Sequence, residues 1–164
     1  MSGSESLDEQ DHRHALLRSI MNCELYLRNG TVYLPTMGKM AEGFYRGVEP
    51  VAVVSVSDIN DVRQALQATT ARGNPIVPML RRSEWKPPVL LKYARVRSWS
   101  AFERGMLFWT IKSNDTSFQI AGQKKQPNGM WNDDPEQTLI FPTGATVDDV
   151  IERMITILQD AERT

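Results

Sequence analysis

The chain contains few of the residues that usually build a chemical site or a covalent framework. Its 164 residues include one cysteine, Cys23, and two histidines. A single cysteine excludes an internal disulfide and a CxxC metal or redox site, and it is typical of proteins from a reducing cytoplasm. Lysine and arginine number 19, and aspartate and glutamate number 20. This balance excludes the overall basicity of a non-specific nucleic-acid binder.

Long hydrophobic runs are also missing. Residues 1–22, MSGSESLDEQDHRHALLRSIMN, are polar and lack the apolar segment of a signal peptide. Apolar runs elsewhere reach roughly five residues, whereas a helix that spans a bilayer needs roughly 20. We therefore expect a cytoplasmic protein without a membrane partner.

The motifs of several common enzyme classes are absent as well. The glycines at 38, 43 and 47 fit neither GxxxxGK[ST] nor GxGxxG, and the chain has no GxSxG and no HExxH. His12 and His14 are two residues apart, so on a helix they would point to different faces and chelate a metal poorly. We expect no catalytic residue, no cofactor and no metal site.

Enough apolar residues remain to form a core. The chain is 41% hydrophobic and 24% charged, which is ordinary for a soluble globular domain. A chain of this length buries roughly 70% of the surface that its unfolded form exposes. We expect residues 23–164 to form a single α+β domain. Residues 1–22 are expected to be a poorly ordered or helical extension, in which Ser6 caps a short helix that ends near Ile20.

Alternating apolar residues predict most of a sheet. Residues 23–35, CELYLRNGTVYLP, read as two strands joined by Asn29 and Gly30, a pair that favours a type I′ hairpin turn. The run VAVVSV over 51–56 has the length and β-branching of a buried strand. Residues 126–135 read as a loop. Further strands are expected at 89–96, 107–111, 117–121 and 137–141.

Two helices have clear start signals. Asp58 is placed to cap a helix that Gly73 ends, and Thr146 with Asp149 has the pattern of a capping box before a second helix. Apolar residues at helical spacing follow each cap. We therefore predict an α+β fold, a largely antiparallel sheet of five to six strands with two main helices packed on it. Four of the nine prolines lie between residues 75 and 88, which favours an exposed connection with irregular, functional backbone.

Charge is sorted along the sequence. Residues 126–164 carry eight acidic and two basic side chains, whereas residues 81–104 carry seven basic and two acidic ones. The basic segment also holds four aromatic residues, a combination that suits base stacking and phosphate contacts in an RNA-associated module. The interpretation that we favour is that this alternation marks the solvated face of a strand whose aromatic residues lie in the core.

The acidic segment favours a protein partner. Trp131 lies beside three acidic residues in the expected loop, where a desolvated aromatic anchor and charges that steer a cationic partner would occur together. A solvated turn is the alternative interpretation. Trp85, in the proline-rich connection, is a second candidate anchor. The residues that we predict to contact a partner are Trp131, Asp133, Asp134, Glu136, Trp85, Arg81 and Arg82.

Four stretches together resemble a known class of proteins: NGTVYLP (29–35), VEPVAVVSVSD (48–58), VLLKYARVRSWSAFERG (89–105) and GMWNDDPEQTLIFPTGATVDDVIERM (129–154). Their layout is similar to that of small bacterial immunity proteins, the partners of contact-dependent growth-inhibition toxins. The resemblance implies a non-enzymatic cytoplasmic protein that forms a heterodimer with the C-terminal domain of a toxin, often a nuclease. It implies inhibition by covering the active or substrate-binding surface of the toxin. A nucleic acid is the less favoured partner.

Overall fold

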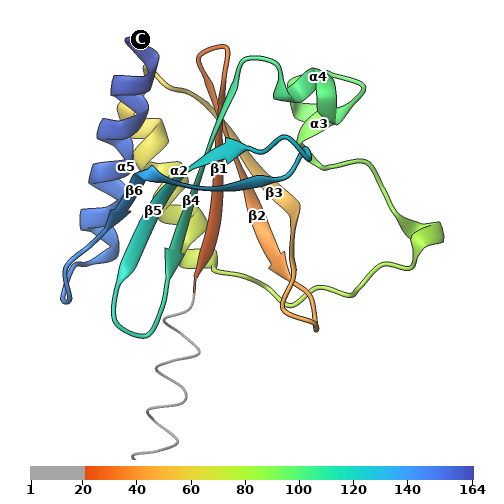
Figure 1. Ribbon diagram of the computed structural model, residues 1–164, viewed down its shortest axis with the longest axis horizontal. Helices are drawn as coiled ribbons and strands as arrows, with labels where there is room; N and C mark the ends of the chain where they lie inside the picture. The colour runs from red at the N-terminus through yellow and green to blue at the C-terminus, as the bar shows by residue number, and fades with distance from the viewer. Residues whose placement is uncertain (1–20) are drawn as a thin grey trace, which may run out of the picture.

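The computed structural model of the chain describes residues 21–164 (Figure 1). The expected helix over residues 6–20 and the His12 and His14 pair lie outside the described residues. Six antiparallel strands form one sheet in the order β3-β2-β1-β4-β5-β6. The strands are β1 (Asn22–Arg28), β2 (Thr31–Lys39), β3 (Tyr45–Ser55), β4 (Met106–Ser113), β5 (Phe118–Lys125) and β6 (Trp131–Ile140). The predicted α+β fold with a largely antiparallel sheet is confirmed.

The first hairpin forms as its sequence predicts. Asn29 and Gly30 have φ angles of 52° and 74°, and this pair of left-handed residues matches the twist of the strands that a type I′ turn joins. Tyr26 pairs with Tyr33 across β1 and β2. The other neighbour of β1 is β4, so the hairpin strand β1 lies in the middle of the sheet.

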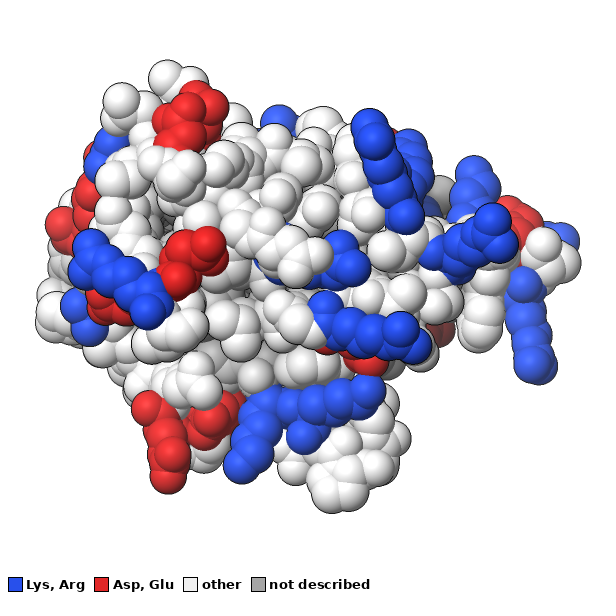
Figure 2. Space-filling model, turned by 90° about the horizontal axis from the view of Figure 1, so that it is seen from above, with Lys and Arg blue, Asp and Glu red and all other residues white. Residues whose placement is uncertain are grey.

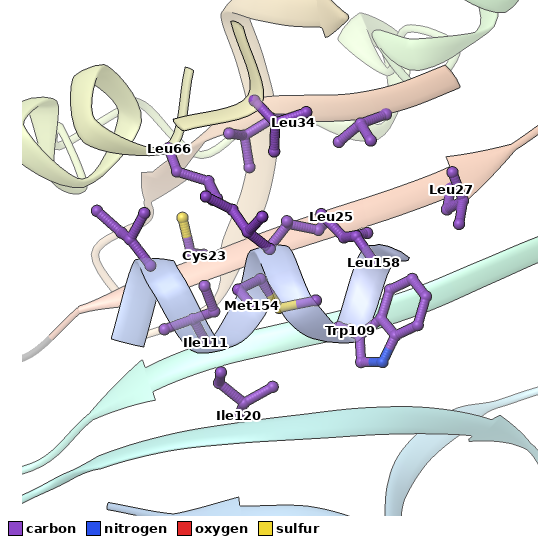
Figure 3. Packing of buried hydrophobic residues seen from close by; sticks show 14 of the residues in the cluster. Cys23, Leu25, Leu27, Leu34, Leu66, Trp109, Ile111, Ile120, Met154 and Leu158 are labelled. Atoms are coloured by element: carbon purple, nitrogen blue, oxygen red, sulfur yellow. The ribbon is translucent and has the colours of Figure 1, made fainter. Parts of the chain in front are cut away.

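Two long helices cover one face of the sheet, α2 (Ile59–Arg72) and α5 (Val147–Glu162) (Figure 1). The Asp58 side chain accepts a hydrogen bond from the Asp61 backbone N–H at 3.2 Å. Thr146 and Asp149 form the expected capping box. The main core lies between these helices and the sheet, and Figure 3 shows its side chains meeting around Met154 of α5.

The opposite face is covered at one end by two short helices, α3 (Leu90–Ala94) and α4 (Trp99–Glu103). Phe102 is fully buried there, and its ring packs edge-on against both Tyr26 and Tyr33. This second cluster also contains Leu90, Leu91 and Met106. The sheet is therefore packed on both faces, but only partly on the face of α3 and α4.

The expectation of a strand over 89–96 is wrong, because residues 90–94 form α3. Adjacent Leu90 and Leu91 are both buried, a pattern that a helix end permits and an alternating strand does not. Pro88 accepts a hydrogen bond from the Leu91 N–H at 3.1 Å, which starts the first turn. Arg95 then takes a left-handed conformation with φ of 57° and ends the helix.

The expected loop over 126–135 and the strand beginning at 137 are corrected too, because β6 already begins at Trp131. The register of β5 against β6 shifts between Ala121 and Gln123, and residues 134–137 have no partner in the ladder and form a bulge. A bulge shifts the alternation of inward and outward side chains. The acidic residues and Pro135 around this irregularity therefore resemble a turn in the sequence.

Most of the run over 51–56 is an edge strand and not a buried one. Residues 51–55 are the second half of β3, which begins at Tyr45 and, among residues 21–164, pairs with β2 alone, whereas Val56 follows the strand and is buried. Val53 is 40% exposed on its outer side. β-branched composition is shared by edge and central strands, so it does not distinguish the two.

Candidate functional site beneath the proline-rich arm

The proline-rich segment over residues 75–88, here called the arm, leaves the end of α2 and returns at α3. Its base is fixed to β2, since the Lys39 N–H donates to the Pro75 carbonyl at 2.8 Å and the Val77 N–H donates to the Lys39 carbonyl at 3.0 Å. A Cβ atom on Gly38 would lie 2.6 Å from Val77 Cγ1, so the close approach of the arm requires glycine at this position.

The outer part of the arm is exposed, as the proline content predicts. Residues 81–88 are all exposed, and they contain only a single short turn, η1 (Arg82–Glu84). Three large apolar side chains of the arm are exposed as well, Ile76 at 87%, Trp85 at 69% and Met79 at 52%. In Figure 1 the arm swings away from the sheet as a wide loop.

A groove of about 1280 Å³ lies between the arm, α3 and the sheet. Glu24 and Tyr26 of β1 and Pro35 of β2 line it from the sheet. Its other lining residues come mostly from the β2–β3 hairpin, the arm and the two short helices. They include Met40, Met79, Leu80, Trp85, Val89 and Trp99.

Glu24 is a partly buried carboxylate on the sheet side of this groove. The Tyr26 hydroxyl donates a hydrogen bond to its Oε2 at 2.7 Å. Burial raises the pKa of Glu24, although the bond from Tyr26 and the charge of Lys112 oppose the rise. Burial and the neighbouring carboxylate also raise the pKa of Tyr26 well above its usual range. Tyr26 therefore stays a protonated donor at physiological pH.

A second carboxylate of the groove, Glu49, is exposed and already paired. Lys92 forms an ion pair with it, and the Tyr93 hydroxyl donates a hydrogen bond to it. These two hydrogen bonds lower the pKa of Glu49. The three side chains tie α3 to β3 and so help to shape the groove wall.

The surroundings of the groove are basic. Arg46, Lys86, Lys92 and Arg97 line it, and the predicted contact residues Arg81 and Arg82 lie on the arm beside it. Figure 2 shows more Lys and Arg on the half of the molecule that carries the arm, and more Asp and Glu on the half that carries α5. The charge sorting seen in the sequence is therefore kept in space.

Three predicted acidic contact residues lie on β6, at the opposite edge of the sheet from β3, and are here called the acidic edge: Asp133, Asp134 and Glu136. Gln123 Nε2 donates to Asp133 Oδ1 at 2.7 Å. Asp134 Oδ1 accepts from the backbone N–H of Glu136 at 3.0 Å. Within residues 21–164, no hydrogen bond or ion pair joins the acidic edge to the arm, so the predicted contact residues do not form one bonded cluster.

Trp131 is partly buried and packs against the second core cluster. Its ring stands edge-on to Phe108 at 6.0 Å, and its Nε1 donates to Glu103 Oε1 at 2.8 Å. Trp99 donates to the same oxygen at 2.7 Å. Of the two tryptophans predicted to contact a partner, Trp85 is the one with an exposed side chain.

Sequence reasoning missed Glu24 and Tyr26. The signal was present in CELYLR, where Cys23, Leu25 and Leu27 alternate with Glu24 and Tyr26. Odd-numbered residues of this strand enter the main core and even-numbered ones face the groove side. A single acidic residue in such an alternation normally indicates a solvated face, and only the arm and α3 turn that face into a groove.

Within residues 21–164, no group of three or more His, Cys, Asp and Glu side chains is placed to hold a metal ion. No helix in the same part of the chain is long and apolar enough to cross a membrane.

Solved structures that are similar to this chain include the following two. One is a protein of unknown function from Neisseria meningitidis, with a TM-score of 0.60 and 9% identity over 88% of this chain and 96% of the other. The second belongs to a CdiA-CT/CdiI toxin and immunity complex from Yersinia pseudotuberculosis, with a TM-score of 0.55 and 10% identity over 85% of this chain and 97% of the other. At these identities the likeness is one of fold. No family model and no curated protein sequence matches the chain.

Proposed function

We propose that this chain is an immunity protein that binds the C-terminal domain of a cognate toxin and neutralises it. The observation that carries the proposal is the shared fold with a chain of the toxin and immunity complex, which extends over 97% of that chain. The exposed arm and the groove beneath it agree with a protein that works by covering a partner. Inhibition is then stoichiometric, with one immunity protein blocking one toxin domain in the cytoplasm.

The arm and the groove are the proposed main contact surface. Exposed tryptophan is the side chain most enriched among residues that dominate binding energy, and Trp85 is 69% exposed beside the exposed Met79. Arg81 and Arg82 add charged contacts on the same segment. A partner that covers the arm would bury these apolar groups, which otherwise remain in water.

The acidic edge has a different proposed role. A nuclease toxin must present a basic surface to phosphate, and acidic side chains can occupy such a surface in place of nucleic acid. Asp133 and Glu136 are exposed on β6, where they are placed to attract a basic domain during association. We propose them as steering residues, since exposed charges affect association rate more than final affinity.

The decisive experiment uses the toxin domain encoded next to the gene of this chain, with binding and inhibition measured at equal concentrations. We expect a one-to-one complex and loss of toxin activity at one equivalent. Trp85→Ala should weaken binding at least about tenfold. The matched control is Ile140→Ala, because Ile140 is 65% exposed at the end of β6, outside the arm, and does not line the groove. A wild-type chain that neither binds nor inhibits the domain would refute the proposal.

The RNA-associated alternative has less support from the structure. Among the four aromatic residues of segment 81–104, Phe102 is buried and Trp99 is hydrogen-bonded to Glu103. Tyr93 is partly buried against the second core cluster, which leaves Trp85 as the exposed ring. Stacking of successive bases needs several free rings. Filter binding with a salt titration separates the two functions, because RNA binding would show a steep negative salt slope.

A further inference from the structure

We propose that Glu24 is a receptor for one basic side chain, a lysine or an arginine, that the toxin domain inserts into the groove. This inference rests on the proposed function and identifies the chemistry that the groove selects. It concerns a residue that lies outside the arm and the acidic edge.

Glu24 lies on the face of β1 opposite to the main core. Its neighbours Cys23 and Leu25 are 2% and 0% exposed in the main core, so the Glu24 side chain leaves the opposite face of β1, where it lines the groove. Oε2 accepts the Tyr26 hydroxyl at 2.7 Å. An ionised carboxylate has about four acceptor sites, and within residues 21–164 no ion pair to Glu24 is formed. The charge of Lys112 acts on Glu24 without an ion pair in this part of the chain, so acceptor sites of the carboxylate are available to a cation that enters the groove.

The surroundings of Glu24 favour a cation once the groove is filled. Apolar side chains such as Met79, Leu80 and Val89 line the same groove as Glu24, and a partner that fills the groove excludes the remaining water. A carboxylate without a cation becomes costly under these conditions, whereas a charge-assisted hydrogen bond offsets the loss of solvent. The long apolar stems of lysine and arginine suit this groove, because their methylene groups can pack on its apolar lining while the charged end contacts Glu24.

The other charged residues of the groove limit which segment of the toxin domain can bind there. Lys86 and Arg97 line the groove and are exposed, whereas Glu24 is partly buried. A segment rich in basic residues would be repelled by these cations. The groove therefore fits a segment with a single lysine or arginine flanked by neutral or acidic residues. This pattern of one buried acid and exposed bases gives the groove a means to discriminate between toxin domains.

The test compares wild type, Glu24→Gln and the control Glu42→Gln for binding to the purified toxin domain by calorimetry. Glu42 is exposed and does not line the groove. Glu24→Gln keeps the shape and the acceptor for Tyr26, and thermal unfolding verifies that the variant folds. We expect binding at least about tenfold weaker for Glu24→Gln and unchanged binding for Glu42→Gln. If wild type binds and folded Glu24→Gln binds equally well, Glu24 is not the receptor, and the proposed function stands.

The partner side of the contact provides an independent readout. Each lysine and arginine of the toxin domain is changed to alanine and measured against wild type and Glu24→Gln. One of these changes should lose its effect when Glu24 is already replaced, because the two side chains form one pair. Additive losses at every basic position would overturn the inference even if Glu24→Gln weakens binding. Absence of binding by the wild-type chain would remove both the proposed function and this inference.

Discussion

The indole Nε1 of Trp131 donates a hydrogen bond to Glu103 Oε1, 2.8 Å away. Trp99 reaches the same oxygen at 2.7 Å, and the Lys125 ammonium reaches Oε2 at 2.8 Å. One carboxylate thus joins α4, the end of β5 and the start of β6. This contact holds the β5–β6 hairpin against the second core cluster, so Trp131 has a structural role that its sequence surroundings do not indicate.

Changing Trp131 should cost stability, whereas changing Trp85 should not. Trp131→Phe removes a hydrogen bond to a charged acceptor and part of the contact with Phe108, so we expect unfolding to become easier by about 2 kcal/mol. Trp85→Phe on the exposed arm should stay within about 0.5 kcal/mol of wild type. Urea denaturation curves, monitored by circular dichroism, measure the free energy of unfolding of both variants. Equal effects of the two substitutions would contradict the packing described for Trp131.

The stability contributed by Glu103 should depend on pH. Burial by itself would raise the pKa of Glu103, but the hydrogen bonds from Lys125, Trp131 and Trp99 outweigh burial and lower it. A carboxyl group whose pKa is lower in the folded state stabilises the fold above its unfolded pKa of about 4.3. This stabilisation is lost as the pH falls through the folded value.

We therefore expect Glu103→Gln to destabilise the chain by about 1–3 kcal/mol at pH 7. The difference from wild type should shrink as the pH is lowered from about 5 to 3, since the wild-type carboxyl group then takes up its proton. Denaturation curves at four or five pH values measure this difference. A difference that stays constant over that range would show that the charge of Glu103 is not responsible.

Gly38→Ala should displace the base of the arm. The added methyl group would lie 2.6 Å from Val77 Cγ1, and overpacking of this kind typically costs about 1–3 kcal/mol. We expect faster amide exchange at Val77 and faster trypsin cleavage on the arm. The double variant with Gly38→Ala and Val77→Ala should regain much of the protection from exchange and cleavage. The Val77→Ala change removes both Cγ methyl groups of Val77, which are the groups that the new Cβ atom meets. Unchanged cleavage in the single variant would show that the arm does not depend on this contact.

The thiol of Cys23 should be inert in the folded chain. Burial, followed by the nearby charge of Glu24, raises its pKa to about 12, and the side chain is 2% exposed. Because the thiolate is the reactive form, a disulfide reagent at pH 8 should modify Cys23 only as fast as the chain unfolds. Fast modification of the folded protein, measured by the release of the coloured thiol, would contradict this burial.

The elements with local signals could be predicted from the sequence. Asn29 and Gly30 determine their turn through their own backbone preferences, and Thr146 with Asp149 caps a helix through side chains three residues apart. By contrast, α3 depends on the packing of Leu90 and Leu91 onto the second cluster. Five residues alone have little intrinsic tendency to form a helix, so no local pattern predicts it.

The candidate site was less accessible to prediction because it depends on distant segments. The proline content of residues 75–88 predicts an exposed arm, and residues 81–88 are exposed in the structure; the contact predicted for Trp85 stays a prediction. That the arm stands over Glu24 follows from the contact of Gly38 with Val77 and the bonds of Lys39 to the arm. Such long-range contacts join residues that are 36 or more positions apart, and residue patterns within one segment do not reveal them.

The most direct test of the proposed function measures survival. Bacteria that lack this chain would produce the toxin domain encoded next to it, with and without the chain supplied from a second plasmid. We predict growth arrest without the chain, full growth with wild type, and weaker rescue by the folded Trp85→Ala variant than by Ile140→Ala. Arrest that is the same with and without the wild-type chain would contradict the account.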